Sequence, residues 1–348
     1  MTATLAPWLQ RSLQQLLAGQ SHAVLIQGPS GLGQRLLGEQ YAAARLCEQR
    51  EVDGSACGRC ASCRLLASHT HPDCFYLLPE TMALEQGYPL DEKAQKDLDE
   101  KKRKPRKTIG IDQVRDVVAS TEQTSARARG QVVLVYPAEA MTIPAANAFL
   151  KTLEEPQGNV KLLLITEAAE QLLPTIRSRC SSLTLTWPAP DEALHYLRNQ
   201  HPKADAAVLA NALRAAGGRP LDADMWLGSG LAARWPELPR ALAQGQATAL
   251  ADCSPQTALD ALQKLCHDLW CAKVHAVPRY FALADLPPAP SARALHAWAQ
   301  LLGQWARSIE HPLKPDLLLE DMVAQTRQFL KPVARVARPR GHAVNSRH

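Results

Sequence analysis

Residues 23–33 read Ala-Val-Leu-Ile-Gln-Gly-Pro-Ser-Gly-Leu-Gly, and this stretch decides the fold. Its first four residues form a continuous apolar run, which is typical of a strand buried on both faces of a parallel sheet. The glycine-rich turn leads into a segment, ending near residue 46, that has the pattern of a helix. A strand, a glycine turn and a helix in this order predict the opening of a doubly wound α/β domain.

The glycine turn has the spacing of a phosphate-binding loop but lacks its reactive residues. A working loop reads G-x-x-x-x-G-K-[ST], in which backbone N–H groups cradle phosphates, the Lys balances their charge and the hydroxyl holds Mg²⁺. Gly28 and Gly33 occupy the glycine positions, with Gly31 between them, but Gln34 and Arg35 replace the Lys and the hydroxyl. Gln has no charge and Arg cannot ligate a cation. We therefore expect a degenerate loop and no ATP bound by this chain.

A second ATPase feature is also missing. The apolar run Val132–Val135 predicts a central strand, and an ATPase carries two acidic residues directly after such a strand, one for Mg²⁺ and one to activate water. Tyr136 and Pro137 stand there instead. Two interpretations stay open at this point: a phosphate-loop domain that has lost its chemistry, or glycines that only make a turn.

The strand-like runs stop at Pro188-Ala189-Pro190, and the remainder reads as helical with breaks at Gly217-Gly218 and Gly228-Ser229-Gly230. This pattern predicts four segments: an α/β domain with a cysteine-bearing insertion at 1–187, a small helical domain at 188–228, a larger helical domain at 229–332 and a disordered basic tail at 333–348.

Four cysteines have metal-ligand spacing. Cys57, Cys60 and Cys63 form C-x₂-C-x₂-C, and Cys47 lies a short loop upstream. Four thiolates close a tetrahedral site with no open position, which indicates a structural Zn²⁺ and makes the nearby His69 and His71 unnecessary as ligands. The alternatives are four reduced thiols on a loop, or a redox pair at Cys57 and Cys60.

The composition limits the class of protein. Hydrophobic residues make up 46% of the 348, enough for sizeable cores, and the net charge of +5 is compatible with a nucleic-acid partner without requiring one. The first 17 residues lack the apolar core of a signal peptide, and no apolar run is long enough to span a membrane. We therefore expect a cytoplasmic protein whose nine cysteines are thiols or metal ligands.

A basic run, Lys101–Lys107, closes a segment at 86–107 that we expect to be an exposed loop. Such a run can contact nucleic-acid phosphates. Acidic residues precede it and no aromatic residues interleave with it, so a solvated loop is the favoured interpretation.

The stretch from Val132 to Cys180 carries a family resemblance. Residues 147–156 read Asn-Ala-Phe-Leu-Lys-Thr-Leu-Glu-Glu-Pro, and Ser178-Arg179-Cys180 follows. These motifs, together with the cysteine cluster and Thr70-His71-Pro72-Asp73, resemble the clamp-loader subunits of bacterial DNA polymerase III. The resemblance covers about residues 1–187 firmly, and the helical remainder only by length and order.

The resemblance implies an architecture and a role. The chain would have an AAA+ α/β domain, a helical lid at 188–228 and a helical collar at 229–332 that joins the subunits of a pentameric loader. That complex opens the ring-shaped sliding clamp and places it on primer-template DNA. Its other subunits, gamma/tau and delta, are the implied partners, and the implied location is the bacterial cytoplasm, at the replisome on the nucleoid.

Within this family, this chain resembles the delta-prime type. The ATP-hydrolysing gamma/tau type keeps the Lys, the hydroxyl and the acidic pair, whereas the delta-prime type often lacks them and keeps the Ser-Arg-Cys. The chain would then be a subunit of a DNA-directed DNA polymerase holoenzyme, a nucleotidyltransferase, with no ATPase or polymerase active site of its own. A gamma/tau-type ATPase, or a zinc-bearing DNA-binding protein that uses the basic run, are the alternative functions.

Arg179 is the residue to which the resemblance assigns catalysis. It would act in trans, on ATP held by a neighbouring subunit. An arginine supplied in this way stabilises the negative charge on a transferring phosphate, and such residues contribute about 10³–10⁵ in rate in other systems. A planar, bidentate and permanently charged group suits that task better than Lys does. The alternative is a helix-terminal arginine that makes a local salt bridge.

Overall fold

The computed structural model describes residues 5–251, 253–308 and 315–330. The chain divides into two compact units, Met1–Glu192 and Ala193–His348, called here the N-terminal and C-terminal units. All of the predicted tail at 333–348 lies outside the described residues, so that prediction stays open. In the described part of the chain, no helix is long and apolar enough to cross a membrane.

The N-terminal unit is built on a sheet of five parallel strands in the order β2-β3-β4-β1-β5. Every residue of β3 is buried, as its continuous apolar run predicted. The strands are β1 (Ala23–Gln27), β2 (Cys74–Leu77), β3 (Gln131–Val135), β4 (Val160–Thr166) and β5 (Ser181–Thr184).

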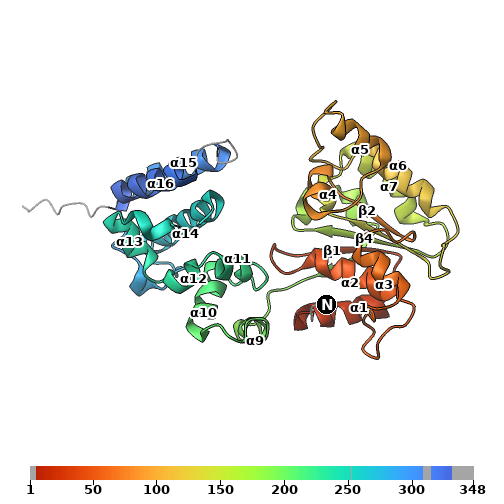
Figure 1. Ribbon diagram of the computed structural model, residues 1–348, viewed down its shortest axis with the longest axis horizontal. Coiled ribbons are helices and arrows are strands. Elements are labelled where there is room, and N and C mark those ends of the chain that lie inside the picture. Colours follow the sequence, from red (N-terminus) through yellow and green to blue (C-terminus); the bar gives the residue numbers. More distant parts are fainter. Residues whose placement is uncertain (1–4, 252, 309–314, 331–348) are drawn as a thin grey trace, which may run out of the picture. The chain divides into compact units, whose positions relative to one another are not determined.

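Helices flank this sheet on both faces (Figure 1). Helices α6 and α7 pack on one face around the buried Phe149, while α2 lies against the other face and contacts α1. Gly38 of α2 sits so close to the sheet that a β-carbon there would collide with Ile165. The helices are α1 (Pro7–Ala18), α2 (Gln34–Leu46), α3 (Ala61–Ala67), α4 (Glu80–Gln86), α5 (Glu92–Asp99), α6 (Ile111–Thr121), α7 (Ile143–Glu154) and α8 (Pro174–Arg177).

This arrangement confirms the predicted α/β domain, a parallel sheet with flanking helices. Two local predictions need correction. The segment 86–107 is not all loop, because the Asp91 side chain accepts a hydrogen bond from the Ala94 N–H and caps α5. The strand-like pattern was expected to continue up to Pro188, but the last strand ends at Thr184, because its partner β1 ends at Gln27 and offers its last carbonyl to Leu185.

The C-terminal unit is helical, as predicted. One cluster of buried apolar side chains, which includes Trp226, Trp235 and Trp298, extends from Ala193 to Leu330. This cluster crosses the predicted border at residues 228/229, so the division into lid and collar stays a prediction. The helices are α9 (Pro190–Gln200), α10 (Ala206–Ala215), α11 (Ala223–Gly228), α12 (Leu231–Arg234), α13 (Leu238–Gln244), α14 (Pro255–Lys273), α15 (Ala292–Ser308) and α16 (Pro315–Leu330).

A buried carboxylate ties the segment after α14 back to that helix. Asp268 is 0% exposed, and its carboxylate accepts the backbone N–H groups of Arg279, Tyr280 and Phe281 at 2.7–2.9 Å. The His267 ring lies 2.8 Å from the same carboxylate. Backbone N–H groups that are buried without an acceptor are costly, so this single side chain makes the chain path after α14 possible.

Replacing Asp268 by Ala should lower the free energy of unfolding by about 3 kcal/mol or more, because three N–H groups would lose their acceptor at about 1–3 kcal/mol each. Urea denaturation followed by tryptophan fluorescence measures this loss, since Trp226 and Trp235 lie in the same core. The matched control is Asp321→Ala, which removes an exposed contact to Gln325 and should cost less than about 0.5 kcal/mol. Equal losses for the two variants would contradict the anchoring role.

Candidate functional site

The loop between β1 and α2 keeps the glycines of a phosphate-binding loop for backbone reasons. Gly31 and Gly33 have φ values of 79° and 92°, in the left-handed region that favours glycine. A β-carbon at Gly28 would lie 2.8 Å from the carbonyl oxygen of Leu185. The turn therefore requires glycine at these positions whether or not a phosphate binds.

Gln34 fills the position of the missing Lys. Its side chain is 2% exposed, and its Nε2 donates hydrogen bonds to the carbonyl oxygens of Gly28 and Pro29 at 2.7 and 2.6 Å. The side chain thus folds back onto the loop. It satisfies the loop's own carbonyls and presents no positive charge to a phosphate.

Arg35, at the position of the missing hydroxyl, is held by other side chains. Its Nη1 lies 2.7 Å from the Glu39 carboxylate and 3.2 Å from the Tyr88 hydroxyl.

At the end of β3, burial and then the negative charge of Glu167 raise the pKa of Tyr136 to about 12, so this side chain is neutral at pH 7. The two positions directly after β3 carry no carboxylate.

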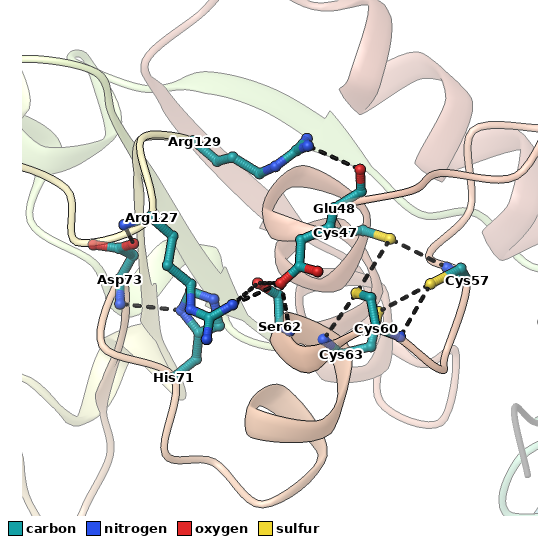
Figure 2. A network of polar contacts seen from close by, with 10 residues as sticks. All are labelled: Cys47, Glu48, Cys57, Cys60, Ser62, Cys63, His71, Asp73, Arg127 and Arg129. Atoms are coloured by element: carbon teal, nitrogen blue, oxygen red, sulfur yellow. Dashed lines mark hydrogen bonds and ion pairs between the residues drawn. The ribbon is translucent and has the colours of Figure 1, made fainter.

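The four predicted metal ligands come together. Cys47 follows α2, Cys57 lies in the loop, Cys60 caps α3 and Cys63 lies in its first turn. Their sulfurs all lie within 4.8 Å of one another, and the Cys47–Cys60 and Cys57–Cys63 pairs are 3.9 and 4.0 Å apart (Figure 2). A tetrahedron with metal–sulfur bonds of about 2.3 Å has sulfur–sulfur edges of about 3.8 Å. The cluster could therefore hold a metal ion.

Backbone N–H groups point at these sulfurs. The N–H groups of Arg59 and Cys60 lower the pKa of Cys57 to about 6, which favours the thiolate that binds metal. Burial raises the pKa of Cys47 and Cys63. Neither nearby histidine belongs to the cluster: His69 stacks on Tyr88, and the His71 Nδ1 accepts the Asp73 N–H.

One carboxylate beside the cluster was missed by the sequence analysis. Glu48, next to Cys47, accepts hydrogen bonds from the N–H and hydroxyl of Ser62 at 3.1 Å and from Arg127 at 2.6 Å (Figure 2). It thereby links the end of α2, the start of α3 and the turn before β3. No local pattern indicates this link, because Arg127 lies 79 positions from Glu48.

Arg179 lies between α8 and β5, where it makes a local ion pair. Its Nε and Nη2 contact the Glu154 carboxylate at the end of α7, and its Nη1 donates to the Thr175 carbonyl at 2.9 Å. Its side chain remains 32% exposed. Because the strands are parallel, the start of β5 lies at the sheet edge opposite to the Gly28–Gly33 loop. Arg179 is therefore remote from any nucleotide that this loop could hold.

The family model described as DNA polymerase III, delta subunit, matches residues 3–188. The chain belongs to this family. It is 41% identical over 231 residues to the DNA polymerase III subunit delta' of Pseudomonas aeruginosa, covering 66% of this chain and 63% of that protein. It is 35% identical over 221 residues to the subunit delta' of Escherichia coli, covering 62% and 58%.

The similarity extends to a second type of subunit at a lower level. The DNA polymerase III subunit tau of Salmonella typhimurium is 28% identical over 206 residues, covering 58% of this chain and 28% of that protein. The chain spans about three fifths of the length of the delta' relatives that it matches.

Calorimetric titration of the isolated chain with Mg-ATP should show no binding at micromolar concentrations, because Gln34 supplies no charge and Arg35 is held by Glu39. Gln34→Lys should not create ATP hydrolysis, since Tyr136 and Pro137 still provide no carboxylate after β3. Gln34→Ala, which opens the loop without adding charge, is the control. Micromolar ATP affinity in the unchanged chain would contradict this description of the loop.

Proposed function

We propose that this chain is a delta-prime-type subunit of a DNA polymerase III clamp loader, which helps to load the sliding clamp onto primed DNA without hydrolysing ATP itself. Membership of the family supports the complex, and the buried Gln34 amide in place of the phosphate-binding Lys is the observation that favours a non-hydrolysing subunit. Gamma/tau and delta subunits would be its direct partners. The clamp and primer-template DNA would be reached through the complex.

The proposed complex gives the helical region its role. Residues 188–228 would form the lid and residues 229–332 the collar through which the subunits assemble.

The test of the proposed function is reconstitution of the loader with and without this chain, followed by measurement of clamp loading and DNA-stimulated ATP turnover. Loss of both without the chain supports the proposal, and unchanged clamp loading in its absence would refute it.

We further propose that Cys47, Cys57, Cys60 and Cys63 hold one structural Zn²⁺. The sulfur–sulfur distances and the N–H groups around Cys57 support this ligand set. Four thiolates leave no position for water or substrate, so the ion would contribute stability and no catalysis. It would fix the chain between α2 and α3, which carries Cys57.

Protein purified without chelator should contain about one zinc per chain by elemental analysis. Cys60→Ser should lose most of it and melt at a lower temperature, because a three-thiolate site binds the ion more weakly. Cys271→Ser should keep its zinc, although Cys271 lies in a second group of possible metal ligands with His267 and Asp268. Free titration of all four thiols in untreated protein would refute the zinc site.

We also propose that Arg179 acts on ATP bound to a neighbouring subunit. Its position at the edge opposite to its own loop and its partial exposure support a role across an interface. The pair with Glu154 would have to open or turn toward the neighbour. Opening costs little, since an ion pair this exposed contributes at most about 1 kcal/mol.

Arg179→Ala should leave the chain folded and able to assemble, while ATP hydrolysis at the one site that it faces falls by about 10³-fold or more. Arg177→Ala is the matched control, because Arg177 is exposed and lies two residues earlier. It should change turnover little. Full ATP turnover and clamp loading by a complex that contains Arg179→Ala would leave Arg179 a structural residue only.

A further inference from the structure

Four arginines surround a shallow hollow on the N-terminal unit, called here the arginine hollow. Arg45 lies in the last turn of α2, Arg50 follows that helix, and Arg127 and Arg129 lie in the turn before β3. Ala128 and Asn159 complete the lining. Because Asn159 directly precedes β4, the hollow lies at the edge where these strands begin, opposite to the Gly28–Gly33 loop.

The turn that carries two of these arginines is held rigidly. The Asp73 carboxylate, 1% exposed, accepts the backbone N–H groups of Ala126 and Arg127 at 2.7 and 2.9 Å. Ala128 adopts a left-handed conformation with φ of 55°, which an alanine rarely does unless its neighbours impose it. The turn between Arg127 and Arg129 is therefore fixed before any ligand arrives.

The guanidinium groups are oriented mainly by neutral oxygens. Arg129 donates to the Glu48 carbonyl at 2.8 Å, Arg45 to the Asn159 side chain at 3.1 Å and Arg50 to the Arg45 carbonyl at 3.3 Å. Figure 2 shows Arg127 and Arg129 meeting Glu48 beside the cysteine cluster. Each of these contacts uses one nitrogen and leaves other donors of the same guanidinium for a ligand.

The positive charge of the hollow is largely uncompensated. Within the described residues, Arg127 alone among the four arginines has an ion pair, with Glu48. Guanidinium groups do not lose their proton in proteins, so this charge persists at every physiological pH. Burial first, and then the positive charge of Arg45, lower the pKa of nearby Lys161, as expected beside a positive centre.

We propose that the arginine hollow binds the phosphodiester backbone of nucleic acid, so that this chain contacts DNA directly. Guanidinium forks match phosphate oxygens in a bidentate geometry. The lining contains no aromatic residue on which a base could stack, so the contact would read no sequence. An acidic peptide is less suited, because protein interfaces have cores enriched in aromatic residues, whereas interfaces with DNA are polar and strongly basic.

The binding test uses the isolated full-length chain and a short fluorescent DNA duplex, with anisotropy measured from about 50 to about 200 mM salt. The combined variant Arg45→Gln, Arg50→Gln and Arg129→Gln removes three charges and retains Arg127 with its ion pair. Each lost phosphate contact should reduce the slope of log affinity against log salt by about 0.9, so the triple variant should lose about 2.7. Its affinity at the lowest salt should fall at least about tenfold.

The matched control is Lys101→Gln, Lys104→Gln and Lys107→Gln, which removes the same charge from the basic run. This control should retain the salt slope of the unchanged chain. The proposal is wrong if the chain does not bind the duplex, if the lysine variant loses as much affinity as the arginine variant, or if polyglutamate binds the hollow as tightly. It is also wrong if inorganic phosphate displaces more DNA than the accompanying rise in ionic strength explains. That result would indicate a site for one small anion.

This test is independent of the proposed role in clamp loading, because no other subunit is present. A chain that supports clamp loading but binds no duplex would refute the arginine hollow and leave the proposed function intact. A chain that binds duplex through these arginines but does not support clamp loading would support the arginine hollow and refute the proposed function. Unchanged circular dichroism and metal content in the arginine variant ensure that lost binding is not lost folding.

Discussion

Parallel pairing of five strands is the constraint on which the N-terminal unit depends. It gives the sheet two chemically different edges, one where all the strands end and one where they all begin. The degenerate loop and Tyr136 lie at the first edge. Arg179, Glu154 and the arginine hollow lie at the second. If the proposed loss of ATP chemistry at the first edge and the proposed roles at the second edge are correct, the sheet serves this chain as a scaffold for the second edge.

Polar side chains secure this scaffold at places where regular structure ends. Gln34 satisfies the carbonyls of the loop after β1, Asp73 satisfies N–H groups of the turn before β3, and Glu48 joins that turn to the cysteine segment. Each of these residues replaces contacts that a helix or strand would otherwise supply. In the C-terminal unit, Asp268 does the same for the segment after α14.

Much of the fold could be predicted because its signals are local. Continuous apolar runs marked β1 and β3, and the cysteine spacing marked the cysteine cluster, since a short loop must bring neighbouring cysteines together. The arginine hollow could not be predicted, because its residues are separated by up to 114 positions and meet only once β3 and β4 pair. The Arg179–Glu154 pair could not be predicted either, because it joins the ends of two separate helices. Helix α5 was missed because its main signal is one capping aspartate, Asp91, within a charged segment.

The self-satisfied loop at Gly28–Gly33 has a thermodynamic consequence. A protein that binds a ligand only when folded gains stability as the ligand concentration rises, so a nucleotide-binding subunit changes in stability and shape with each turnover. Here the Gln34 amide occupies the interior of the loop and bonds to its carbonyls. If the chain binds no ATP, as proposed, the folding equilibrium of this unit would not depend on the cellular ratio of ATP to ADP. In the proposed clamp loader, this unit would then keep one structure while the ATP-hydrolysing subunits change theirs.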